Sequence, residues 1–171
     1  MNKFIVLMAF LLFGSFFATN GLAEVKDADA NTSLSKELKL RASYDKTVSW
    51  IEKNKKVIQN QSGFDSVKDL GDGKFRISKD TPRGMFVWTI KETEVKKDGK
   101  CYFKSSLISC EQGGIIYSDS EIVVSPSGSG SYIEINAQVG VTHPRVRSPQ
   151  LKIDTNIHLN AIKRLLEENV R

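Results

Sequence analysis

The pattern of apolar and polar residues changes its period near the start of the chain. In the segment Leu38 to Ala42, apolar residues alternate with Lys39 and Arg41, which is the two-residue period of a half-buried strand. From Tyr44 to Ile58 the apolar residues follow the spacing of one helix face. Ser43 stands directly before this helix, where its side chain can accept a hydrogen bond from the first turn. The pattern therefore predicts a strand followed at once by a helix.

A β pattern then continues for most of the chain. Runs of alternating or apolar residues are separated by turn signals such as GDG, KKDG, CEQGG and SPSGSGS. These runs predict strands at Phe64 to Leu70, Lys74 to Ser78, Met85 to Val95, Lys100 to Ser109, Ile115 to Val124 and Tyr132 to Val141. With the first strand the count is seven, and we expect Ser125 to Ser131 to be a flexible turn.

The last part of the chain predicts a long helix. Pro144 and Pro149 exclude helix from the preceding loop, so the helix is expected to begin near Asp154 or Thr155 and to end near Asn169. Its apolar residues form one stripe, namely Ile157, Ala161, Ile162, Leu165 and Leu166. The sheet is the only large partner against which this stripe can be buried.

The N-terminal residues predict export. Lys3 precedes an apolar-rich run from Phe4 to Phe17, and small residues at Gly21 and Ala23 match a signal-peptidase site. The run is shorter than the roughly 20 residues that span a bilayer. We expect cleavage after Ala23, a periplasmic or secreted protein, and no permanent membrane span after cleavage.

The charge is mild and dispersed. The 171 residues carry a formal net charge of +5, and the basic residues are mixed with acids rather than gathered in one stripe. An exported protein also rarely meets nucleic acid, so nucleic-acid binding is not expected.

The order of the predicted elements resembles a known superfamily. The segments LKLRASYDKTVSWI, FDSVKDLGDGKFRI and TNIHLNAIKRLLEENV are similar to the first strand and helix, the first hairpin and the closing helix of START-like (SRPBCC) proteins. That superfamily includes polyketide cyclase-like and coenzyme Q-binding START-type proteins. The resemblance implies an α+β helix-grip fold, in which a curved sheet holds the last helix. With the N-terminal pattern, the expected organisation is a signal peptide at 1–23, a polar and flexible lead-in at 24–36 and a START-like domain at 37–171.

The resemblance also implies a cavity between the sheet and the last helix, where many members hold a lipid or another hydrophobic small molecule. The candidate lining residues are aromatic or long, and they are Phe75, Phe86, Trp88, Ile90, Tyr102, Tyr117, Tyr132, Ile162 and Leu166. Composition alone does not separate a ligand contact from ordinary core at these positions.

The sequence shows no catalytic or metal site. His143 and His158 have no second His or Cys at ligand spacing, so we expect a solvated or capping residue at each rather than zinc. The Gly-rich SPSGSGSY segment lacks the Lys-Ser or Lys-Thr of a phosphate-binding loop, and no cofactor is indicated. Some START-like cyclases act mainly by shaping a bound substrate, but we expect no enzyme here.

Cys101 and Cys110 set two expectations against each other. Two cysteines in an exported protein favour a disulfide. The predicted strand, however, holds both and separates them by roughly 30 Å, whereas a disulfide needs Cα atoms less than about 7 Å apart. The disulfide and the straight strand exclude each other, and we expect the straight strand.

Two functions fit these observations. The first is an exported START-like domain that binds a hydrophobic small molecule or lipid beneath Ala161 to Leu166. The alternative is a cell-envelope interaction module with a filled core. It would bind a protein partner through an exposed face of the sheet or through the basic loop Arg145 to Lys152.

Overall fold

The computed structural model describes residues 30–60, 65–81, 84–111, 114–142 and 148–171. The expected signal peptide with its cleavage site after Ala23, and the loop residues 143–147, lie outside these ranges and stay predictions. The elements are β1 (Ala30–Leu40), α2 (Tyr44–Lys53), α3 (Lys55–Gln59), β2 (Ser66–Gly71), β3 (Lys74–Thr81), β4 (Gly84–Lys97), β5 (Lys100–Cys110), β6 (Ile115–Ser127), β7 (Gly130–Val141) and α4 (Ser148–Asn169).

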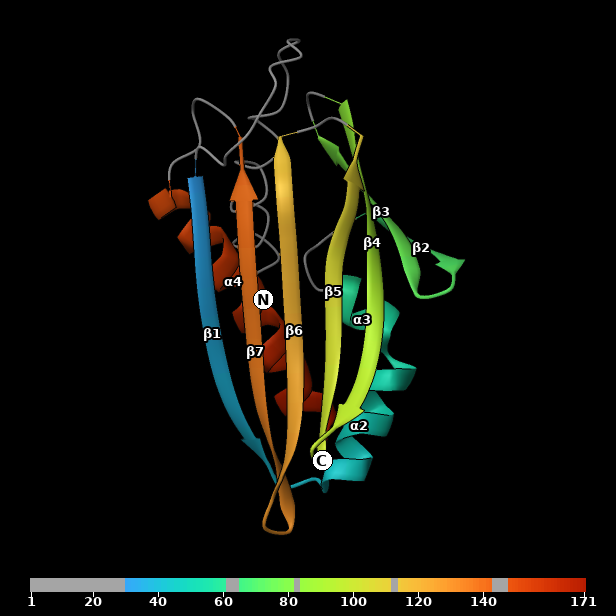
Figure 1. The fold of residues 1–171 in the computed structure, drawn as a ribbon, viewed down its shortest axis with the longest axis vertical. Coiled ribbons are helices and arrows are strands. Elements are labelled where there is room, and N and C mark those ends of the chain that lie inside the picture. Colours follow the sequence, from blue (N-terminus) through green and yellow to red (C-terminus); the bar gives the residue numbers. More distant parts are fainter. Residues whose placement is uncertain (1–29, 61–64, 82–83, 112–113, 143–147) are drawn as a thin grey trace.

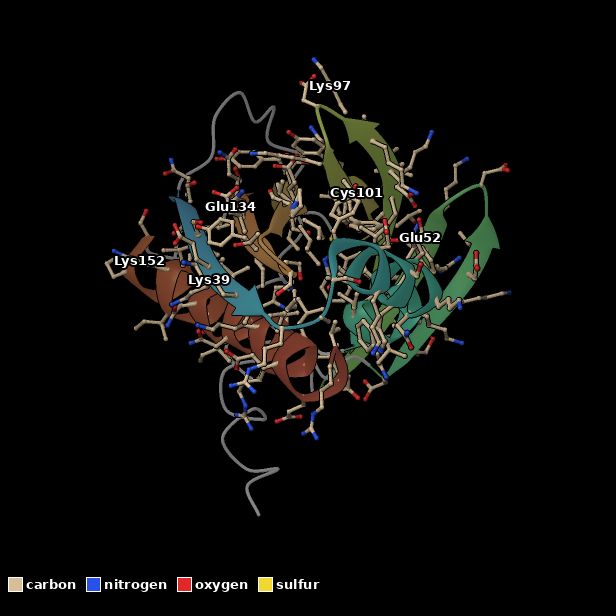
Figure 2. The ribbon with its side chains drawn as sticks, turned by 90° about the horizontal axis from the view of Figure 1, so that it is seen from below. Lys39, Glu52, Lys97, Cys101, Glu134 and Lys152 are labelled. Carbon is tan, nitrogen blue, oxygen red and sulfur yellow. The ribbon has the colours of Figure 1, made fainter. Side chains whose placement is uncertain are left out.

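The described strands form one seven-stranded sheet in the order β1-β7-β6-β5-β4-β3-β2. Every neighbouring pair is antiparallel. The sheet is curved, and α4, α2 and α3 all lie on its concave side (Figure 1; Figure 2). Helix α4 packs along β1 and β7, and α2 lies toward the end of the sheet that holds the β6–β7 turn. The predicted α+β fold, a curved sheet that grips a C-terminal helix, is confirmed.

The core fills the half of the concave side where α2 and the second half of α4 meet. Residues from both helices and from four strands interlock there, and the most buried of them are Ile51, Cys101, Val124, Ile133, Ile135, Leu159 and Leu166. Burial of one such side chain stabilises the fold by about 1.5 to 3 kcal/mol. The predicted helix stripe did not include Leu159, which is fully buried.

The first helix is capped as predicted but ends earlier. Ser43 Oγ accepts a hydrogen bond from the backbone N–H of Lys46 at 3.4 Å. At Asn54 the backbone N–H bonds to Ile51 O at 3.1 Å, and the side-chain Nδ2 donates to Trp50 O at 2.7 Å. These bonds close the last turn of α2 tightly. The expected helix to Ile58 is therefore two helices, with a break at Asn54.

Four expected boundaries were wrong. Strand β1 begins at Ala30 rather than at Leu38, because pairing with β7 continues along its whole length; residues 30–36 thus belong to the sheet and not to the lead-in. Strands β6 and β7 continue to Ser127 and Gly130 instead of leaving a flexible seven-residue turn. Helix α4 begins at Ser148, because Pro149 lies in the first turn, where a helix needs no backbone N–H from it.

Both cysteines lie on β5, and they do not form a disulfide. Cys101 is fully buried on the concave side and lies beside α2 (Figure 2). Cys110 lies at the other end of the strand and pairs with Trp88 after a bulge. The straight-strand expectation therefore holds, and the competing disulfide is not formed.

Candidate functional site

A cavity of about 150 Å³ lies between the first half of α4 and the concave side of the sheet. Most of its wall is apolar and comes from β3 to β7. The apolar lining residues are Ile77, Trp88, Ile90, Leu107, Ile115, Ala137 and Val139. Polar residues lie among them, namely Gln59, Ser105, Ser118, Asp119, Ser120, Thr155 and His158.

The cavity exists because α2 and α3 do not extend over this half of the sheet, which α4 alone covers. Helices α2 and α3 end at Gln59, and their apolar residues Val48, Ile51 and Ile58 fill only the other half. On the sheet, small side chains such as Ser120 and Ala137 face the gap. The amphipathic α4 therefore covers a space that the side chains do not fill.

A second, smaller hollow of about 30 Å³ adjoins the first. The two share four wall residues, namely Gln59, Ser105, Ser120 and His158. The smaller hollow also touches Glu92 and Phe103. Its volume holds one water-sized group, because such a group needs about 10 to 15 Å³ on this measure. The site is thus a ring-sized, largely apolar chamber beside a smaller hollow whose wall includes Glu92 and Gln59.

Three polar contacts connect α2 and α3 to β4 beside the smaller hollow. Lys96 Nζ lies 3.0 Å from Glu52 Oε1, Lys55 Nζ lies 3.4 Å from Glu94 Oε2, and Gln59 Nε2 donates to Glu92 Oε1. We call these contacts the helix–strand ladder. The ladder residues on the helices are three and four positions apart, and those on β4 are two apart. These spacings place each set on one face of its element, and the two faces meet. Figure 2 shows Glu52 on α2.

Burial shifts the pKa values of His158 and Glu92, which lie where the two cavities adjoin. Burial lowers the pKa of His158 to about 4, so the imidazole is neutral at pH 7. Burial also raises the pKa of Glu92, opposed by the Gln59 hydrogen bond and by the charge of Lys55. The part of the His158 surface that stays open faces the cavities. The expectation of a solvated or capping His158 was therefore wrong, and His143 lies outside the described residues.

The structure brings only some of the predicted lining residues to the site. Trp88 and Ile90 line the larger cavity, and Ile162 lines the smaller one. Phe75 is buried in a cluster with Val67, Ile77 and Ile90, and Leu166 is fully buried in the main core. The side chain of Phe86 lies outside what the structure describes. The cavity also lies under Thr155 to Ile162, not under Ala161 to Leu166 as expected.

The three predicted tyrosines lie on the outer face of the sheet. Tyr102 alternates with the inward-facing Cys101 and Phe103, and its ring lies 5.8 Å from Lys104 Nζ. Tyr117 lies across Gly140, where a Cβ atom would meet its ring. Tyr132 bonds to Glu37, and this hydrogen bond is the largest cause that raises the pKa of Tyr132 to about 12. Their assignment to the cavity was wrong because these side chains point away from α4.

Four polar residues at the junction were not predicted. His158 was read as solvated, and Gln59, Glu92 and Ser120 were not singled out. A signal for His158 exists in its spacing, because it lies three residues after Thr155 and four before Ile162, on the buried side of α4. For the others the sequence carries no signal, because their place depends on which strand meets α3.

No group of three or more His, Cys, Asp or Glu side chains that could hold a metal ion occurs in the described ranges. None of the helices described is long and apolar enough to cross a membrane. The residues that line the two cavities offer apolar surface and a few hydrogen-bonding groups.

Comparison with known proteins identifies the fold. No protein-family model matches the chain, and no curated protein matches its sequence significantly. Solved structures do match. A START superfamily protein from Mycobacterium smegmatis aligns with a TM-score of 0.63 at 15% identity, over 81% of this chain and 96% of that chain.

Two further structures have the same architecture. Ara h 8.0201 aligns with a TM-score of 0.61 at 9% identity, over 82% of this chain and 98% of its own. A truncated norcoclaurine synthase from Thalictrum flavum aligns with a TM-score of 0.54 at 19% identity, over 86% of this chain and 99% of that chain. At these identities the likeness establishes the START-like helix-grip fold.

Proposed function

We propose that this chain, which has the START-like helix-grip fold, is an exported protein that binds a compact hydrophobic molecule in the cavity under the first half of α4. The observation that carries the proposal is the apolar chamber of about 150 Å³ walled by Trp88, Ile90 and Leu107. A space of about this volume accepts a molecule the size of benzene. Binding would gain the free energy of burying apolar surface.

The volume decides between the ligand classes that the fold allows. Drug-sized and lipid-sized ligands need chambers of about 300 to 1,000 Å³, whereas this chamber is near 150 Å³. A single ring with a short substituent fills it. We therefore favour a one-ring molecule over a lipid, a quinone or a sterol. Export belongs to the proposal and depends on residues 1–23.

Native mass spectrometry tests this function. The protein is purified from its exported compartment, weighed intact and extracted with organic solvent. The proposal predicts a bound molecule of about one ring, or its uptake when benzyl alcohol is added. A stoichiometric phospholipid would contradict the size argument. A bare mass with no uptake, together with a co-purified protein partner, would favour the interaction module instead.

A further inference from the structure

The helix–strand ladder contains three carboxylates, and one of them differs from the others. Glu52 is paired with Lys96, and Glu94 lies within 3.4 Å of both Lys55 and Lys96. Within the described ranges, the Glu92 carboxylate is reached only by the neutral amide of Gln59, through Oε1. The second oxygen of Glu92 is thus available to another donor.

The same carboxylate lies where a ligand would place its polar end. Glu92 lines the smaller hollow, which shares the wall residues Gln59, Ser105 and His158 with the chamber walled by Trp88. For a ring in the chamber, this hollow is the adjoining space that one substituent would occupy. The 30 Å³ available there suits a group of one heavy atom.

The charged side chains around this hollow leave the negative charge of Glu92 uncompensated. Lys55 is already paired with Glu94, and Lys104, which also lines the hollow, is 3.1 Å from Glu121. Asp69 adds a further negative charge near Glu92. His158 is neutral at pH 7, so it adds no cation to the hollow. Half-buried carboxylates bind best to a charged donor.

We propose that Glu92 selects the ligand, and that the cavity takes a compact apolar molecule carrying a protonated amine, with the ring against Trp88 and the ammonium at the open oxygen of Glu92. This inference rests on the proposed function. An anionic ligand is disfavoured, because it would place two negative charges together in a poorly solvated space. A neutral hydroxyl fits the same volume but makes the weaker hydrogen bond.

Benzylamine and benzyl alcohol test the proposal, because they have the same shape and differ in the charge of the head group. Each is titrated into the purified protein at pH 7.5, and the dissociation constant is taken from amide shifts in ¹H–¹⁵N spectra. We expect benzylamine to bind about tenfold more tightly, the ratio that corresponds to about 1.4 kcal/mol. In Glu92→Gln the two probes should bind equally, with the alcohol unchanged within about twofold.

Glu111→Gln is the control, because Glu111 is an exposed carboxylate that pairs with Arg76 and lines neither cavity, and its loss leaves the Lys55–Glu94 pair in place. This variant should keep the amine preference. Equal affinities of the two probes for the wild-type protein would overturn the amine proposal while leaving the proposed function standing. A preference that survives in Glu92→Gln would do the same. If neither probe binds the wild-type protein, both proposals fail.

Discussion

The side-chain hydroxyls of Thr47 on α2 and Ser131 on β7 form a fully buried hydrogen bond of 2.8 Å. This bond joins the start of the first helix to the tip of the β6–β7 hairpin, 84 residues later in the sequence. Burying two hydroxyls is favourable only when they satisfy each other. The pair therefore fixes α2 against the sheet, and with it Ile51 in the wall of the smaller hollow.

Thr47→Val is expected to lower the free energy of unfolding by about 1 to 3 kcal/mol, because Ser131 then keeps a buried hydroxyl without its partner. Ser131→Ala should cost a similar amount. The double variant should cost clearly less than the sum, since neither hydroxyl is left behind. Urea unfolding of the four proteins measures the cycle. Strictly additive losses would show that the two side chains do not act as a pair.

Ala137→Leu is expected to abolish binding of benzyl alcohol without unfolding the protein. Ala137 lies on the cavity wall, so three added carbon atoms enter empty space and should stabilise the fold by about 1 kcal/mol. The measurements are the dissociation constant and the melting temperature.

Ala161→Leu is the control for this variant, because Ala161 is half-buried on α4 but lines neither cavity. It should leave binding intact. Retained binding in Ala137→Leu would place the ligand elsewhere, whereas a lower melting temperature would mean that the space is already filled.

His158 should make the protein sensitive to acid. Its pKa is about 4 in the folded state and about 6.5 when unfolded, so the unfolded chain binds more protons between these values. The contribution is fully present above pH 6.5 and falls as the pH drops toward 4. At pH 5 the loss amounts to about 2 kcal/mol.

Urea unfolding at pH 7.5 and pH 5 measures this loss. His158→Gln removes the titrating ring, so the difference between the two pH values should shrink by about 2 kcal/mol relative to wild type. An unchanged difference would mean that the ring is solvated after all.

The two thiols should differ in reactivity. Cys101 is fully buried, and burial is the largest cause that raises the pKa of its thiol, so it should resist alkylation until the protein is unfolded. Cys110 is only partly buried and should react first. Mass spectrometry after alkylation, with and without reductant, measures both. Thiols that appear only on reduction would contradict the strand assignment of β5.

Most of the fold was predictable because its signals are local. The two-residue period at Leu38 to Leu40 indicated a strand, and Ser43 indicated the start of α2; the structure confirms both. The early start of β1 was not predictable, because its first residues are polar and are held by pairing with β7. The start of α4 was missed because the exclusion of helix at Pro149 ignored the first turn, which tolerates proline.

The site was less predictable, because it depends on which way each side chain faces. Tyr102 stands between Cys101 and Phe103. Three successive residues with apolar or aromatic side chains do not show whether the odd-numbered or the even-numbered ones face the core. Near Tyr117 a bulge shifts the pairing of β6 with β7, so counting along the strand fails there. The meeting of Gln59 with Glu92 joins elements 33 residues apart and depends on tertiary packing alone.

The most direct test of ligand binding is a ¹H–¹⁵N titration of the purified protein with benzyl alcohol. We expect saturable binding, with the largest shifts at amides of the cavity wall, such as Ser120, Ala137 and Val139. No such shifts are expected in Ala137→Leu. Titration to the solubility limit without saturable shifts at these residues would contradict the claim that this fold holds a compact hydrophobic molecule.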